Sequence, residues 1–281
     1  EVERIHRLAG ALKSDPALRK QGQRSAQPVP VAHRRRAWRP SLAWAAILLL
    51  ALGGGLWLSI DPGREPSVQY ATKIGEQRRV DLPDGSGLFL DANTLVLVTY
   101  GHSQRHVELL SGRLQANVAH DGNRPFVVTS GVGTVRALGT IFQVERQHRN
   151  TVVSLLQGRV VVDTRGGRAG HVRELQPLQQ LTYDPGGILG PKRSIDRSEA
   201  ESWLHGRLTF NEERLADLVA EFNRYSQDQL ILSEPALGDI RVSGIFDATD
   251  QAGLLAALRQ GWGLQAKQVS SNRMELPASK Q

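Results

Sequence analysis

A length of 281 residues exceeds the usual size of one domain and predicts two small folded modules with a tail. The formal charge of +7 would suggest a nucleic-acid or lipid partner, but residues 1–40 account for all of it, with ten Lys or Arg and three acidic residues. The balanced remainder argues against direct nucleic-acid binding, and the absence of cysteine excludes a disulfide framework and a thiolate metal site.

Residues 1–40 are predicted to be a cytoplasmic tail with one short helix. Apolar residues at helical spacing indicate that helix at residues 2–12, and the Pro, Gln and Ser residues that follow indicate a flexible linker. The sequence starts with Glu1 and its only methionine is Met274, so we expect it to begin inside a longer reading frame.

Residues 41–60, SLAWAAILLLALGGGLWLSI, are predicted to form one transmembrane helix. They contain no ionisable side chain and, at about 1.5 Å per residue, reach across the roughly 30 Å of a bilayer core. A buried core helix would normally carry a polar stripe, and a signal peptide would lie near the start of the chain. Basic residues directly before the segment place the N-terminus in the cytoplasm and suit contact with anionic lipid. These topology residues are Arg34, Arg35, Arg36 and Arg39.

Residues 67–190 are predicted to form a small antiparallel β-sandwich or roll on the periplasmic side. Short β-rich runs alternate with turn residues, and Asp84-Gly85 supplies a hairpin turn. Apolar residues follow the strand period of two in two successive runs, at Leu88 and Leu90 and at Leu95 and Leu97.

An internal repeat lies within this β-rich region. VELLSGRLQANV at 107–118 and VSLLQGRVVVDT at 153–164 share the pattern V-x-L-L-x-G-R. We therefore expect one strand, turn, strand unit to be used twice.

Residues 203–281 are predicted to form a separate module of two β-α-β units. After a strand at 208–210, Asn211 is a candidate N-cap, and Glu212 and Glu213 would lie in the first turn of a helix, where acidic residues suit the helix dipole. Further strands are expected at 230–232 and 240–246, a second helix through Leu254, Leu255 and Leu258, and a last hairpin that turns at Ser271-Asn272. The fold class is thus mainly β with an α+β module.

No enzyme motif is present in the sequence. There is no phosphate-binding loop, no G-x-S-x-G elbow and no H-E-x-x-H pair. His102 and His106 are four residues apart, but no carboxylate or thiolate at motif spacing completes a zinc site. We predict no cofactor, no metal and no turnover of an external substrate.

Five ordered motifs resemble the FecR family of sigma-factor regulators, which are transmembrane anti-sigma factors. The match runs from about Tyr70 into the C-terminal module, in the family's order and with a membrane span ahead of it. The motifs are IGEQRRVDLPDGSGLFLDANT (74–94), RHVELLSGRLQANVAHDGNRPFVV (105–128), VRALGTIFQV (135–144), VVSLLQGRVVV (152–162) and WLHGRLTFNEERLADLVAEFNRYS (203–226).

The resemblance implies a relay across the inner membrane. Family members pass a signal from an outer-membrane TonB-dependent receptor, often one for ferric siderophore, to a cytoplasmic extracytoplasmic-function sigma factor. Periplasmic and intramembrane proteases release that factor in steps. The family's sigma-contacting helices would precede Glu1, so no sigma-contacting residue is named here.

The C-terminal module resembles the small signalling domain of such receptors and is the candidate surface for docking the receptor's own signalling domain. Two β-α-β units offer exposed strand edges and apolar faces for such a partner. The residues chosen to represent this candidate docking module are Leu215, Leu218, Phe222, Ile240 and Val242.

Some family members also cut themselves at a Gly-Thr bond that corresponds to Gly139-Thr140. The Thr140 hydroxyl can attack the preceding carbonyl, where Gly139 has no side chain to obstruct it, and His120 is a candidate base. On its own the dipeptide is equally typical of a turn that enters a strand.

Two other classes of function stay open at this point. A membrane-anchored envelope protein that binds cell-wall or exported polysaccharide would need aromatic surfaces for stacking on sugars, and the 15 aromatic residues are spread thinly. A membrane-anchored hydrolase would need a convergent acid, base and nucleophile, which no motif indicates.

Overall fold

The computed structural model describes residues 66–165 and 172–277, which lie within one compact unit of the chain, 62–281. The predicted tail, the predicted transmembrane helix at 41–60 and the four topology arginines lie outside the described residues. None of the helices in the described part is long and apolar enough to cross a membrane.

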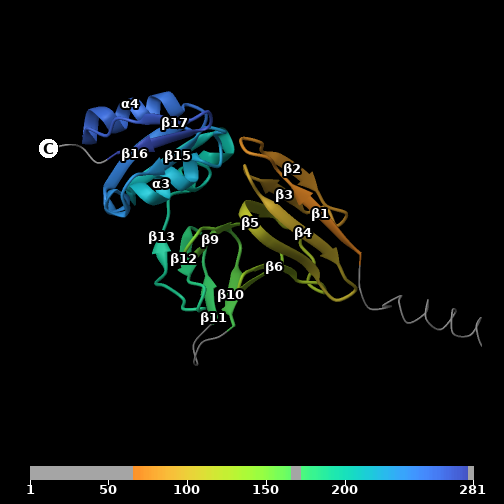
Figure 1. The fold of residues 1–281 in the computed structure, drawn as a ribbon. Coiled ribbons are helices and arrows are strands. Elements are labelled where there is room, and N and C mark those ends of the chain that lie inside the picture. Colours follow the sequence, from red (N-terminus) through yellow and green to blue (C-terminus); the bar gives the residue numbers. More distant parts are fainter. Residues whose placement is uncertain (1–65, 166–171, 278–281) are drawn as a thin grey trace, which may run out of the picture. The chain divides into compact units, whose positions relative to one another are not determined.

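The β domain is one continuous sheet of 13 strands, which the long strand β5 (Arg105–Asn117) divides into two layers (Figure 1). We call the layers sheet A and sheet B. Sheet A has the order β1-β4-β5-β6-β7-β10-β11 and sheet B the order β2-β3-β5-β8-β9-β12-β13. Sheet A contains β1 (Ser67–Ala71), β4 (Leu95–Tyr100), β6 (Phe126–Ser130), β7 (Gly133–Ala137), β10 (Val160–Thr164) and β11 (Val172–Leu175). Sheet B contains β2 (Arg78–Asp81), β3 (Gly87–Leu90), β8 (Ile141–Arg146), β9 (Thr151–Gln157), β12 (Gln179–Tyr183) and β13 (Arg193–Ser194).

The two layers share one apolar core. Leu109 and Val128 of sheet A and Leu114 and Phe142 of sheet B are all fully buried in the same cluster. This arrangement agrees with the predicted sandwich or roll. The prediction of an antiparallel sheet was wrong at one pair, because β6 runs parallel to the first half of β5.

The internal repeat is a pair of crossings between the layers. The first copy is a single strand, β5, which bends from sheet A into sheet B at Gly112. The second copy leaves sheet B at the end of β9, turns at Gly158 and enters sheet A as β10. Both glycines have positive φ, +85° and +87°, a conformation that only glycine adopts without strain. The predicted strand, turn, strand unit is thus correct for the second copy and wrong for the first.

The alternation of apolar residues predicted the buried face of β3 correctly and that of β4 wrongly. Leu88 and Leu90 of β3 are buried in the core as predicted. In β4 the core residues are Val96 and Val98, whereas the predicted Leu95 and Leu97 lie on the opposite, half-exposed face. Both faces of β4 are apolar, so hydrophobicity alone cannot choose between them.

The predicted hairpin turn at Asp84-Gly85 is confirmed between β2 and β3. Gly85 has a φ of +83°, and its N–H donates to the Leu82 carbonyl at 3.0 Å. The Asp84 carboxylate points into the domain, where it accepts a hydrogen bond from Arg105 at 2.7 Å. Asp84 therefore both forms the turn and neutralises a fully buried arginine.

The C-terminal module follows a short connecting segment made of α2 (Arg197–Ala200) and η3 (Ser202–His205). Its elements are β14 (Arg207–Arg214), α3 (Leu215–Phe222), β15 (Gln229–Leu232), η4 (Pro235–Asp239), β16 (Arg241–Asp247), α4 (Gln251–Trp262), β17 (Lys267–Ser270) and β18 (Arg273–Leu276). The strands on either side of each helix do not pair with each other. Instead β14 pairs with β16, and β18 lies between β15 and β17, so the two halves of the module are interleaved (Figure 1).

The predicted start of the first module helix was wrong. Asn211, Glu212 and Glu213 belong to β14, and α3 begins only at Leu215 with Arg214 as its N-cap residue. A bulge between Phe210 and Glu213 keeps the strand paired with β16, and the Glu212 N–H donates to the Ser243 hydroxyl at 2.9 Å. The Ser243 side chain of β16 thus satisfies the Glu212 N–H, a backbone group that the prediction had assigned to a helix turn.

Candidate functional site

The outer face of sheet B is polar and is covered by the C-terminal module. Side chains alternate along β5 and β8, so Leu114 and Phe142 enter the core while their neighbours point outward. The outward side chains at the centre of these strands are Phe89, Arg113, Gln115, Gln143 and Glu145, and these five are buried or half-buried. A polar sheet face normally contacts water. The burial of this face therefore indicates a specific contact between the β domain and the segment that follows it.

A group of six side chains lies at the centre of this contact, and we call it the charged cluster. The β domain provides three members and α3 with the turn after it provides the other three. They are Asp91, Arg113 and Glu145, and Glu221, Arg224 and Tyr225.

Arg113 is the central member of the charged cluster. Its Nε donates to Asp91 Oδ2 at 2.8 Å, and its Nη2 donates to Glu221 Oε1 at 2.7 Å. Its guanidinium carbon also lies 4.6 Å from the centre of the Trp203 ring, within the range of a cation–π contact. Arg113 therefore binds its own domain through Asp91, the module through Glu221 and the connecting segment through Trp203.

The module returns two donors to the β domain. The Tyr225 hydroxyl contacts both oxygens of Asp91, at 2.7 and 2.8 Å. The Arg224 guanidinium donates to the Ala92 carbonyl at 3.0 and 3.2 Å, and its Nη2 lies 3.1 Å from Asp91 Oδ2. Asp91 is completely buried, so these contacts replace the water that an exposed carboxylate would have.

The electrostatics of the charged cluster are unbalanced. Burial opposes ionisation of Asp91, but Arg113 and Arg224 outweigh it and hold the pKa of this carboxyl below its usual value. Burial raises the pKa of Glu145 above its usual value, and attraction to Arg113 and Arg224, which repulsion from Glu221 and Asp91 partly cancels, does not offset it. Three carboxylates thus face two guanidinium groups, and the surplus negative charge falls on Glu145.

Outside the charged cluster, the contact is made by one aromatic pair and a few backbone groups. Trp203 packs edge-on against Phe89 with the ring centres 6.2 Å apart. Gln77 Nε2 donates to the Trp203 carbonyl at 2.8 Å, and Gln143 Nε2 donates to the Ala200 carbonyl at 2.9 Å. The Gly75 N–H donates to the Arg224 carbonyl at 3.0 Å.

The residues predicted to represent a docking module form the module's own core. Leu215, Leu218, Phe222 and Val242 are buried, and Ile240 is half-buried against the same cluster. They hold α3 on the strands and are not available as contact residues. The exposed apolar side chains of the module are Ile245 on β16 and Val269 on β17.

The Gly139-Thr140 bond lies in the bend between β7 and β8. Backbone hydrogen bonds fix it on both sides, from the Asp121 N–H to the Leu138 carbonyl at 3.0 Å and from the Val118 N–H to the Thr140 carbonyl at 2.9 Å. These bonds bring His120 beside Gly139, where a methyl group on Gly139 would lie 2.9 Å from His120 Nδ1. The Thr140 hydroxyl is buried and makes no hydrogen bond.

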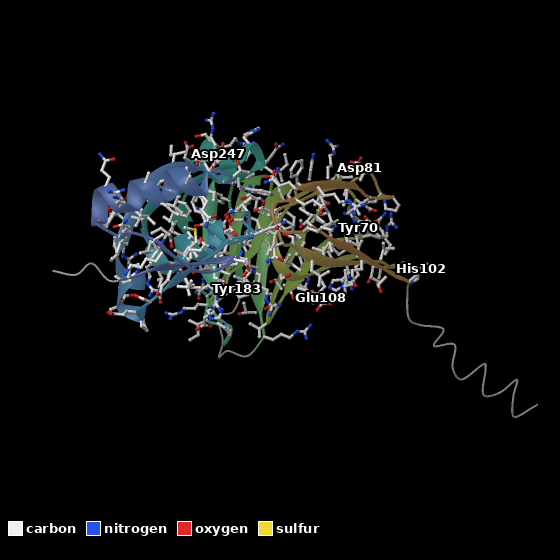
Figure 2. The ribbon with its side chains drawn as sticks, turned by 45° about the horizontal axis from the view of Figure 1, so that its top comes forward. Tyr70, Asp81, His102, Glu108, Tyr183 and Asp247 are labelled. Carbon is white, nitrogen blue, oxygen red and sulfur yellow. The ribbon has the colours of Figure 1, made fainter. Side chains whose placement is uncertain are left out.

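The two histidines that were considered for zinc do not form a site. His102 lies in the turn between β4 and β5, at one end of the strands (Figure 2). His106 Nε2 is 3.0 Å from the Thr129 hydroxyl, and burial lowers the pKa of this imidazole. Across residues 66–165 and 172–277, no three His, Asp or Glu side chains are grouped as metal ligands.

Pattern analysis missed the charged cluster. Its members are separated by up to 134 positions, and no motif of known chemistry contains them. One signal was available, because Asp91, Arg113 and the Glu221–Tyr225 stretch all fall inside the five family-like segments.

Comparison with known proteins agrees with the fold. The family model described as FecR protein matches residues 68–161. Two crystal structures of a putative anti-sigma factor from Parabacteroides distasonis, at 1.65 and 2.50 Å resolution, superpose with TM-scores of 0.68 and 0.67. Each is 25% identical and covers 76% of this chain and 100% of its own chain. No curated protein matches the chain.

The family model covers most of the β domain, residues 68–161, and the superposition covers 76% of the chain. Because β5, β8 and the residue directly after β3 all lie within residues 68–161, the match includes Asp91, Arg113 and Glu145. Residues 68–161 of this chain are a FecR family domain, which confirms the resemblance that the sequence motifs indicated.

Proposed function

We propose that this protein regulates a cytoplasmic sigma factor in response to a signal received on the other side of the inner membrane. The FecR domain carries this proposal, and the similarity to an anti-sigma factor over 76% of the chain supports it. In this proposal the chain crosses the inner membrane once at residues 41–60, with residues 1–40 in the cytoplasm and the described domains in the periplasm.

The finer steps of the proposal come from the family resemblance. A TonB-dependent receptor of the siderophore type delivers the signal through its own signalling domain to the C-terminal module. Periplasmic and intramembrane proteases then cut the chain, and the extracytoplasmic-function sigma factor is released. The exposed residues Ile245 and Val269, both on strands of the module, mark where a partner strand would lie.

Transcription in the native bacterium tests the regulator. We would delete the gene and restore it with the full chain or with the chain lacking residues 203–281. A regulator predicts that deletion changes the promoters of one sigma factor, that the full chain restores them, and that the shortened chain no longer responds to the receptor's ligand. Unchanged sigma-dependent transcripts, with no sigma factor cross-linked to the tagged full chain, would contradict the proposal.

The alternative of a polysaccharide-binding envelope protein has less support. Sugar rings stack on exposed aromatic faces. The large exposed hydrophobic side chains of the described residues are Val, Ile and Leu, and none of them is aromatic. No stacking platform is therefore offered by this part of the chain.

We also propose that the chain cuts itself at Gly139-Thr140, without an external substrate. The supporting observation is the Thr140 hydroxyl, which is buried without a partner next to a bond that His120 adjoins. A buried hydroxyl without a hydrogen bond costs about 1–3 kcal/mol, so its retention calls for an explanation.

The chemistry balances with water alone. The Thr140 oxygen attacks the Gly139 carbonyl carbon and gives its proton to His120, which passes a proton to the Thr140 nitrogen as the amide bond breaks. The resulting ester joins Gly139 to the Thr140 oxygen and leaves a free amine. Water then hydrolyses this ester to a Gly139 carboxylate and restores the Thr140 hydroxyl.

An immunoblot of the full chain, tagged at both ends, tests self-cleavage. We expect two fragments that meet at residue 139, one intact chain for Thr140→Ala, and two fragments again for Thr140→Ser, which keeps a hydroxyl. Thr134→Ala in β7 serves as the matched control. An intact unmodified chain would remove Thr140 from any catalytic role and would leave the sigma-factor proposal in place.

A further inference from the structure

The contact between the β domain and the C-terminal module is mostly polar and charged, as is typical of contacts between domains that can separate. Among the side chains of β3, β5 and β8 that contact the other side, namely Phe89, Arg113 and Glu145, only Phe89 is apolar. The central members are ions and a tyrosine hydroxyl. Polar surfaces of this kind are typical of domain contacts that come apart, whereas permanent contacts are mostly apolar.

Each side of the contact remains satisfied when the two sides separate. In the β domain, Arg113 would still pair with Asp91, to which Gln77 Nε2 also donates at 2.9 Å. In the module, Arg224 would still pair with Glu221, at 3.0 Å and one helical turn away. Separation therefore costs the bonds between the two sides and leaves no ion without a partner.

The two cores are also independent. The core cluster of the β domain and that of the module share no buried residue. Among the described hydrophobic side chains of the β domain, only Phe89 packs against the module's cluster. Opening would thus expose Trp203 and Phe89 and little other apolar surface. The free energy that resists opening comes mainly from the charged cluster.

We propose that the C-terminal module is a detachable cover of sheet B and that the charged cluster is the latch that holds it. Closed, the module occupies the outer face of β3, β5 and β8. A partner that takes Glu221 or Tyr225 away from the β domain opens the latch and frees both the module and that face of the sheet. This device depends on the contacts of the described residues and does not require the sigma-factor proposal.

Glu221 is the best point at which to test the latch. It lies on α3, so changing it leaves every β-domain residue in place, and Arg113 keeps Asp91. Glu221→Arg places a third guanidinium against Arg113 and Arg224, and like charges so close oppose each other strongly. Glu221→Gln is the milder variant, which removes one charge-assisted bond of 2.7 Å.

The chain contains no cysteine, so two introduced cysteines can carry spin labels without interference. We would label the full chain in detergent at Asn150→Cys and Ser271→Cys, exposed hairpin residues of the β domain and the module. A second pair, Asn150→Cys with Ser103→Cys, lies wholly in the β domain and reports unfolding. Glu174→Gln, in the exposed Arg159–Glu174 pair, is the matched control for loss of one surface charge.

Pulsed electron spin resonance then measures the two distances. We expect one dominant cross-contact distance in the unmodified chain and a new population in Glu221→Arg, with the open-to-closed ratio raised at least about tenfold. Glu174→Gln should change neither distance. If Glu221→Arg also changes the distance within the β domain, Glu221→Gln becomes the deciding variant. Its open-to-closed ratio should rise by about threefold to tenfold. An unchanged cross-contact distance in a variant whose internal pair is intact would overturn the latch.

Discussion

Replacing Asp84 by Asn tests the buried ion pair inside the β domain. The Asp84 carboxylate accepts from Arg105 Nη1 at 2.7 Å, and the two side chains are 4% and 0% exposed. It also accepts from the Ser86 N–H, the Ser86 hydroxyl and the Tyr100 hydroxyl, at 3.0, 2.6 and 2.7 Å. Asn has the same shape, but it lacks the charge and presents an amide donor where a second acceptor oxygen stood.

The size of the effect follows from two independent arguments. Burial disfavours the ionised carboxyl, but hydrogen bonds from Ser86, Tyr100 and Arg105 outweigh it and lower the pKa of Asp84 from 3.8 to about 2. At about 1.4 kcal/mol per pKa unit, this shift corresponds to roughly 2 kcal/mol of stability. Removing one partner of a buried ion pair costs about 3–5 kcal/mol by comparison with other proteins. We therefore expect Asp84→Asn to lower the free energy of unfolding by about 3 kcal/mol and Tm by roughly 10 °C.

Unfolding of the full chain by urea, followed by circular dichroism from pH 7 to pH 2, measures this prediction. Because the folded pKa of Asp84 lies below the unfolded one, its contribution is present above about pH 4 and is lost as the pH falls toward 2. The stability gap between the unmodified chain and Asp84→Asn should therefore narrow over this window. The control is Asp81→Asn, whose pair with Arg79 is 77% and 71% exposed and should be worth no more than about 1 kcal/mol. Equal losses for the two variants at pH 7, or a gap that does not change with pH, would refute the reasoning.

Three further changes test other parts of the structure. Gly158→Ala places a methyl group 2.7 Å from Thr140 Cγ2 at a φ of +87°, and unfolding experiments should show that the free energy of unfolding falls by about 3 kcal/mol. The control is Gly131→Ala, where φ is +58° and nothing lies within 4 Å of the added methyl group, and it should cost about 1 kcal/mol. Glu145→Gln removes a carboxyl whose pKa is raised in the folded chain, so its ionisation at pH 7 destabilises the fold. The same experiment should find the variant more stable than the unmodified chain at pH 7, and this difference in stability should disappear below about pH 4.5. Leu218→Ala should lower the stability of the module by about 2–5 kcal/mol. Amide hydrogen exchange should become faster in α3 and β15 and stay unchanged in β3 and β8, whereas faster exchange in all four elements would contradict independent cores.

Local pattern was sufficient for much of the fold. The hairpin at Asp84-Gly85 and the buried face of β3 were both predicted correctly, because each follows from residues that are neighbours in the chain. The same applies to the last hairpin at Ser271-Asn272, which turns between β17 and β18. Turn residues and hydrophobic periodicity specify such elements without reference to the rest of the molecule.

The errors occurred where a distant strand decided the outcome. Asn211 to Glu213 have the composition of a helix start, but the first two form a bulge and Glu213 pairs with Val242 of β16, which extends β14 instead. The sequence of residues 107–118 predicts two strands and a turn. In the structure β3 and β8 pair with the second half of this segment, so that it continues the first half as a single bent strand. Pairing partners far away in sequence override local preference, because each unpaired backbone group in a buried strand costs free energy.

The sequence by itself determined the FecR-like motifs, the β-rich domain and the separate module, and it placed polar residues on the outer face of sheet B. Only the tertiary structure decided that this face is covered, because alternation shows which side chains share a face and carries no information about what lies against it. Arg113 would have been assigned to solvent from its position in β5. Its contact with Glu221 exists because α3 is folded against β5, although the two residues are 108 positions apart.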